Sequence, residues 1–277
     1  MNHKQNYFLI FVWCCAFTAL AFTTIEQILV WLGDSAAHSF VGLHQFLWLG
    51  VLGDFTITIG VLGFRFFIVD PEKFSEAILE TDIQNNIQET NQQLLKPMRY
   101  LNWMPMAAIF GTIATAAIQL NFYLGMVVYL LDQLCLIAAF SGIIHLNRKR
   151  LLGDKNYLLV LISWIVIAAI ITLTMILPGW GIGTLLLLPY ICALIFMTIL
   201  SFFAFLYTDR SLKYRLGLCI GACFFVFSDS IIGYSAQNPF DLSFLLIRPT
   251  YKLAVFFLHT AVLFFRSKTG DTVWKEE

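Results

Sequence analysis

Residues 221–234 read Gly-Ala-Cys-Phe-Phe-Val-Phe-Ser-Asp-Ser-Ile-Ile-Gly-Tyr, an apolar run that carries a single acidic residue, Asp229. The nearest basic residue before this run is Arg215. A run this apolar is typical of a helix in lipid, and a carboxylate at the bilayer centre costs about 2.5–3.5 kcal/mol on insertion scales. We therefore expect Asp229 to have either a buried partner or a function.

The composition of the whole chain is that of a membrane protein. Of its 277 residues, 59% are hydrophobic and 12% are charged, and the mean hydropathy is +0.79. A soluble domain carries about 25% charged residues, whereas a bilayer core takes about 20 apolar residues per helix. We predict an all-α, polytopic integral membrane protein with one transmembrane domain over residues 1–277, in the cell (inner or plasma) membrane. About eight spans are predicted: 8–32, 41–66, 101–119, 122–145, 157–177, 182–207, 214–235 and 246–266.

Basic residues alternate between the two sides of these predicted spans. Lys or Arg precedes the first span, follows the second, fourth and sixth, and closes the chain. The loops in between, such as residues 178–183, contain neither. Because cytoplasmic loops are enriched in Lys and Arg, this pattern places both termini in the cytoplasm. Only an even number of spans produces it.

One long hydrophilic stretch, residues 70–98, lies between the second and third predicted spans. Its apolar residues recur at roughly helical spacing among Glu, Gln and Asn. This pattern fits an amphipathic cytoplasmic helix that lies on the lipid headgroups. The alternative is an arm that docks a protein partner.

Charge and cysteine usage exclude several classes of function. The chain has 17 basic and 17 acidic residues, so it offers no polybasic surface for nucleic acid. All six cysteines fall inside predicted spans, which favours a packing role. Cys219 and Cys223 share a helix face, but the sequence offers too few further ligands beside them for a metal site. We predict no metal and no cofactor.

Several polar residues are predicted to lie in the middle to outer half of the bilayer. Asp54, Asp132 and Asp229 are too short to reach the headgroups from that depth, which favours a functional role or a buried pair. Thr112 and His259 lie at a similar depth, although a lone histidine is more often a hydrogen-bonded packing residue. Their shared depth is expected if these side chains line one cavity.

Two basic residues, Arg248 and Lys252, lie near the outer end of the last predicted span. Their long side chains can reach the membrane surface, so simple anchoring is the favoured interpretation. The alternative is that they receive a phosphate group.

Three stretches resemble the YhhN-like lysoplasmalogenases, small membrane enzymes with eight helices. Residues 221–230 are similar to the G-x-x-x-F-x-x-S-D-s motif of that family's seventh helix. Residues 251–254, Tyr-Lys-Leu-Ala, resemble the Y-x-x-A opening of its eighth helix. Residues 122–137 resemble the F-x-x-G run of its fourth helix, and Pro189-Tyr190 is a weaker similarity. The resemblance extends over roughly residues 100–266.

The sequence departs from the family pattern at three positions. Thr112 stands where the family has an acid in its third helix, and Gln133 stands where it has a histidine. Val255 stands where it has a glutamine. Two acids are candidate substitutes: Asp132, which precedes the lost histidine, and Asp54, which follows a glycine as the family acid does.

The resemblance implies hydrolysis of the vinyl-ether bond of a lysoplasmalogen, with a membrane lysophospholipid as substrate. Such a bond is activated by protonation at carbon, and water then adds, so the chemistry needs an acid and a base. Two carboxyls in an apolar site can divide these roles, one protonated and one ionised. We expect Asp229 to be the acid, with Asp132 as its partner and Asp54 as the next candidate. The expected substrate-binding residues are Ser228, Thr112, Tyr190 and Tyr251 for water or headgroup, and Lys252 and Arg248 for phosphate.

A second hypothesis is a non-catalytic member of the same fold, which binds lipid or assists a protein partner through residues 70–98. The missing acid at Thr112 favours it. A transporter is disfavoured, because the sequence shows no inverted repeat and no matching pair of broken helices.

Overall fold

The computed structural model describes the chain in segments that together cover most of the predicted spans. The described residues are 10–11, 14–15, 17–21, 24–25, 28, 40–63, 65–66, 95–142, 144, 153–175, 182–206, 211–237 and 243–261. Within them every regular element is a helix and no strand occurs. The predicted all-α class is confirmed.

Seven helices have defined bounds in the described part of the chain. They are α2 (Phe40–Gly63), α4 (Leu95–Leu120), α5 (Phe122–Ser141), α7 (Lys155–Met175), α8 (Ile182–Leu206), α9 (Leu212–Gln237) and α10 (Ser243–Thr260). Each corresponds to one of the last seven predicted spans, with ends that differ by a few residues. Only scattered helical residues of the first predicted span, 8–32, are described.

Helix α4 overlaps the end of the predicted amphipathic segment. Helix α4 begins at Leu95, so the last four residues of the 70–98 stretch belong to a membrane helix. Residues 70–94, and most of the loop residues that set the predicted orientation, lie outside the described residues. The cytoplasmic position of both termini stays a prediction.

Five of the described helices are long and apolar enough to cross a membrane: α4, α5, α7, α8 and α9. Helix α7 shows this most clearly, because Leu159 is 65% exposed and Ile170 is 54% exposed on a helix without a polar face. Side chains of this kind on the outside of a bundle suit contact with lipid. The chain is therefore a membrane protein, while the choice of membrane stays a prediction.

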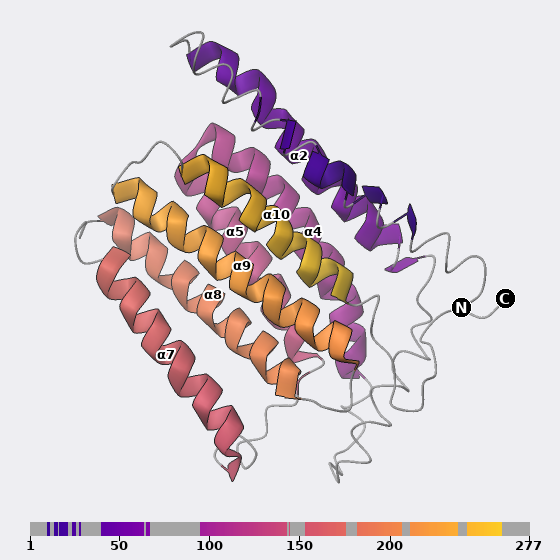
Figure 1. Cartoon of the computed structure of the whole chain (residues 1–277), viewed down its shortest axis with the longest axis vertical. Coiled ribbons are helices and arrows are strands. Elements are labelled where there is room, and N and C mark those ends of the chain that lie inside the picture. Colours follow the sequence, from indigo (N-terminus) through magenta and orange to yellow (C-terminus); the bar gives the residue numbers. More distant parts are fainter. Residues whose placement is uncertain are drawn as a thin grey trace, which may run out of the picture.

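The helices form a bundle in which α9 lies centrally (Figure 1). It packs between α8 and α10, and α7 lies at the outer edge beside α8. Behind them, α5 pairs with α4 and contacts α8. Helix α2 completes the bundle on the other side, against α4 and α10. The chain thus brings α2, α4, α5 and α10 together around one region.

A very short link joins α4 and α5 into a tight hairpin. Asn121 separates them in an extended conformation, with φ −156° and ψ 126°, and its side chain caps α5 by accepting a bond from the Leu124 amide. Gly125 then lies so near α4 that a Cβ there would come within 2.6 Å of the Ile118 Cβ. This close contact fixes how α5 presents Tyr129 and Asp132, one and two turns further along.

Helices α9 and α10 also approach each other through glycines. A Cβ on Gly217 would lie 3.1 Å from the Ala261 Cβ, and one on Gly221 would lie 2.9 Å from the Leu258 amide nitrogen. Small residues four apart allow helix backbones in membranes to come close together. The contact sets the position of Asp229, two turns beyond Gly221, relative to α10.

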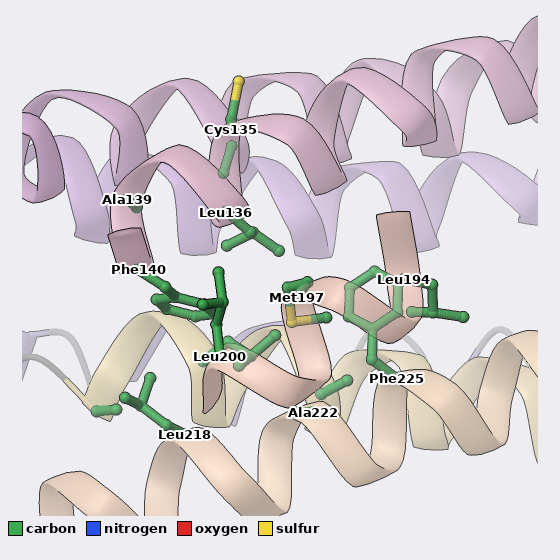
Figure 2. Packing of buried hydrophobic residues seen from close by; sticks show 14 of the residues in the cluster. Cys135, Leu136, Ala139, Phe140, Leu194, Met197, Leu200, Leu218, Ala222 and Phe225 are labelled. Atoms are coloured by element: carbon green, nitrogen blue, oxygen red, sulfur yellow. The ribbon is translucent and has the colours of Figure 1, made fainter. Parts of the chain in front are cut away.

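The apolar core extends through the bundle, and Figure 2 shows the part of it among α5, α8 and α9. Leu136 and Phe140 of α5 point toward Met197 and Leu200 of α8, with Phe225 of α9 beyond them. All five side chains are at most 1% exposed. This tight core holds three of the five helices that surround the larger of the two cavities described below.

Candidate functional site

The larger cavity has a volume of about 70 Å³ and is almost entirely apolar. It lies among α4, α5, α7, α8 and α9. Its lining residues are Ile118, Phe122, Met126, Tyr129, Ile171, Leu187, Tyr190, Ile191, Leu194, Ile195, Asp229, Ser230, Ile232 and Gly233. Since a buried water needs about 10–15 Å³ on this measure, the cavity has room for a group of several heavy atoms.

Asp229 is the one acidic residue on the wall of this apolar cavity. Its Oδ2 accepts a hydrogen bond of 2.5 Å from the hydroxyl of Tyr190, which lies on α8 and is 5% exposed. Asp229 therefore has the buried partner that its cost in lipid requires. Because Asp229 also lines the cavity, its carboxyl can act on a ligand that is bound there.

A second, smaller cavity lies among α2, α4, α5 and α10 and has a much more polar lining. Its volume is about 10 Å³, close to the space of one water molecule. The lining residues are Asp54, Ile57, Thr58, Ala108, Gly111, Thr112, Asp132, Tyr251, Val255 and His259. The structure therefore brings together four of the polar residues predicted to share one depth, and leaves Asp229 in the cavity next to them.

An ion pair joins α2 to α10 at the edge of the smaller cavity. The Lys252 ammonium contacts Asp54 Oδ1, and both residues are 3% exposed. The prediction that Lys252 snorkels to the membrane surface is therefore wrong, because its side chain turns into the bundle. Asp54 thus has the buried partner that an acid at this depth is expected to need.

Thr112 uses its hydroxyl to bind α2. Its Oγ1 lies 2.8 Å from the Oγ1 of Thr58 and 3.1 Å from the Ala108 carbonyl oxygen. Thr58 lies one turn beyond Asp54 and also donates to the Ala108 carbonyl, at 2.9 Å. The threonine pair thus holds α2 against α4 beside the acid.

Three further groups in this cavity, Asp132, His259 and Tyr251, have a buried polar atom without a described hydrogen-bond partner. Asp132 is 2% exposed and its Oδ1 has none, and the same is true of Nε2 of His259, which is 5% exposed. The His259 Nδ1 lies 2.8 Å from the Val255 carbonyl oxygen and can only donate there. In the neutral ring the Nε2 lone pair is then available as an acceptor.

The two cavities are neighbours through a pair of tyrosines. Tyr129 lines the larger cavity and Tyr251 the smaller one, and their rings meet edge to face with centroids 5.5 Å apart. The Tyr129 hydroxyl also lies 3.0 Å from the Thr115 hydroxyl. Asp132 and Asp54 line the smaller cavity and Asp229 lines the larger one beside it, so the three acids belong to one region.

Two predicted site residues lie elsewhere in the structure. Ser228 is completely buried and donates to the Ile247 carbonyl oxygen of α10 at 3.0 Å, and it lines neither cavity. Arg248 is half-buried one turn before Lys252 and lines neither cavity. Their roles in substrate binding stay predictions, whereas Tyr190 and Tyr251 each lie on a cavity wall.

Sequence reasoning predicted that His259 shares a cavity with the acids, but it missed the part that Thr58 and Tyr129 play in these cavities. Tyr129 and Asp132 lie three residues apart on α5 and so share a helix face, which was the available signal. Nothing in the sequence pairs Thr58 with Thr112. Among the described residues no group of three or more His, Cys, Asp or Glu side chains is placed to hold a metal ion.

Comparison with known proteins identifies one relationship. The sequence model of the YhhN family matches residues 95–262, which runs from the start of α4 to the end of α10. A search of curated proteins gave no match, and a search of solved structures gave none either. The matched region holds Asp229, Tyr190, Asp132 and His259 and covers more than half of the chain, and the protein belongs to the YhhN family.

Proposed function

We propose that the protein hydrolyses the vinyl-ether bond of a lysoplasmalogen within the membrane. The reaction adds water across an enol ether: the alkenyl chain leaves as a fatty aldehyde, and the glycerophospho part keeps its oxygen as an alcohol. Membership of the YhhN family, whose members are lysoplasmalogenases, supports the reaction class. The observation that carries the proposal is that, among the described lining residues of a mostly apolar cavity, Asp229 is the one that carries a carboxyl.

The shape and lining of this cavity suit one end of an alkenyl chain. Four isoleucines from α4, α7 and α8 line the cavity together with Asp229 and Tyr190. They are Ile118, Ile171, Ile191 and Ile195. A lysolipid is larger than 70 Å³, so only the reactive end of the chain fits inside, with the rest in lipid. Apolar pockets with a few convergent polar groups are the usual form of a ligand site.

In the proposed mechanism, Asp229 donates a proton to the vinyl carbon remote from oxygen. The neighbouring carbon becomes an oxocarbenium ion, which water attacks while a base takes the proton of that water. The resulting hemiacetal then breaks its bond to the glycerol oxygen, which is protonated as it leaves. Tyr190 holds Asp229 in place through its hydrogen bond, and Asp132, on the wall of the smaller cavity, is the candidate base.

The test is the substrate preference of the purified protein in lipid nanodiscs. We expect aldehyde release from a lysolipid with a vinyl-ether chain, and none from matched lysolipids with a saturated ether or an ester chain. Protonation at carbon is available only to the vinyl ether, so this pattern isolates the proposed chemistry. Binding of all three lipids without release of aldehyde would instead establish the non-catalytic lipid-binding member.

A further inference from the structure

Helix α2 lies outside the region that matches the YhhN family, yet it forms part of the smaller cavity. The family match begins at residue 95, whereas Asp54, Ile57 and Thr58 of α2 line the cavity together with residues of α4, α5 and α10. The contact is polar and specific, because Asp54 pairs with Lys252 and Thr58 bonds to Thr112. A helix added only to cover an apolar surface would not need these contacts.

The cavity that α2 completes has the properties of a site for one water molecule. Its volume of about 10 Å³ matches one water. Asp132 Oδ1 and His259 Nε2 are buried and have no described hydrogen-bond partner, and Asp54 Oδ2 has none either. Buried polar groups are nearly always satisfied by protein or by ordered water. One water molecule in this space can donate its two hydrogens to two of these three acceptors.

We propose that this cavity binds the water that attacks the oxocarbenium ion, and that α2 completes it by supplying Asp54. The inference rests on the proposed hydrolysis and adds its water site. Asp132 or His259 takes one proton as the water oxygen bonds to carbon, and no oxidant or reductant is involved. Asp54 is a positioning residue: it accepts the other hydrogen of the water while Lys252 fixes its carboxylate.

The arrangement of the two cavities sets where the reacting carbon lies. Asp229 acts from the apolar cavity and the water from the polar one, so the carbon is attacked where they adjoin, at the contact of Tyr129 with Tyr251. The acid and the water then approach from different sides. This separation keeps the apolar cavity dry until the substrate is protonated.

Deuterium exchange separates protonation of the vinyl ether from the attack of water on the oxocarbenium ion. In D₂O, an oxocarbenium ion that water does not capture loses a proton from its neighbouring carbon and returns to the vinyl ether with deuterium on that carbon. A variant that has lost only the water site therefore accumulates labelled substrate. A variant that has lost the acid, Asp229→Asn, gives neither aldehyde nor label.

The variant for α2 is Asp54→Asn combined with Lys252→Met, because Asp54→Asn alone removes a carboxylate from beside a buried ammonium and can prevent folding. We expect the folded double variant to release aldehyde about 10–150-fold more slowly, the effect of losing one hydrogen bond to a charged group, and to label its substrate. Adding Thr112→Asp returns a carboxyl to the same cavity from α4, and we expect it to recover part of the rate. Leu52→Ala, at an exposed position of α2, is the matched control.

The variant for the histidine is His259→Asn. The Asn amide can still donate to the Val255 carbonyl, so the local fold is kept while the Nε2 position is lost. We expect slow hydrolysis with labelled substrate here too. A wild-type rate in the double variant, or lost hydrolysis without label in both variants, would overturn the water site. Absence of aldehyde from the wild-type protein would instead reject the proposed function itself, and the water site with it.

Discussion

The buried ion pair between α2 and α10 allows a quantitative prediction of stability. Changing Lys252 to Met removes the ammonium and leaves the Asp54 carboxylate, which is 3% exposed, without its partner. Breaking a buried pair from one side costs about 3–5 kcal/mol, because a charge is left uncompensated away from water. Removing both charges with Asp54→Asn and Lys252→Met is often close to neutral. The two charges should therefore be coupled by several kcal/mol.

Thermal unfolding in detergent measures this coupling. A destabilisation of 1 kcal/mol lowers Tm by about 2–4 °C in domains of 150–250 residues, so the single variant should unfold roughly 10 °C below the wild type. The double variant should recover most of that loss. A single variant with the wild-type Tm would show that the pair contributes nothing. A double variant as unstable as the single would show that the lost stability came from packing of the Lys252 side chain and not from charge.

Two further predictions concern helix packing and the acid. Gly221→Ala should destabilise the protein by about 1–3 kcal/mol, because its Cβ would lie 2.9 Å from the backbone of Leu258, while Gly153→Ala, with no atom within 4 Å, should leave Tm unchanged. Equal Tm values for both would contradict the close contact. Tyr190→Phe removes the hydrogen bond to Asp229, worth about 0.5–1.5 kcal/mol for a neutral acceptor, and should slow aldehyde release about 2–12-fold. An unchanged rate would show that Tyr190 does not position the acid.

The helices could be predicted from sequence because lipid leaves few alternatives. A segment that crosses the bilayer must satisfy its own backbone, so apolar length alone predicts a helix. The bounds of α8 and α9 show this, since they differ from the predicted spans by at most two residues. Helix α4 extends further than predicted, because hydropathy does not detect the polar turns at Leu95–Arg99 that precede the apolar part.

The grouping of the polar residues was predicted only in part. Depth along the helix axis placed Asp54, Asp132 and Asp229 at one level, but it gave no information on which way each helix face turns. The structure separates Asp229 from the other two by a pair of tyrosine rings. The ion pair of Lys252 was not predicted for the same reason. The depth of Lys252 allows its side chain to reach the membrane surface, and only the position of α2 shows that it contacts the Asp54 carboxylate instead.

The rate of aldehyde release by Asp229→Asn tests the central claim most directly. We compare it, on a vinyl-ether lysolipid in nanodiscs, with the wild type and with Cys223→Ala, an exposed position of the same helix. We predict a loss of at least about 100-fold for Asp229→Asn and no change for Cys223→Ala, because only Asp229 can donate the proton to carbon. Aldehyde release by a folded Asp229→Asn at the wild-type rate would contradict the account.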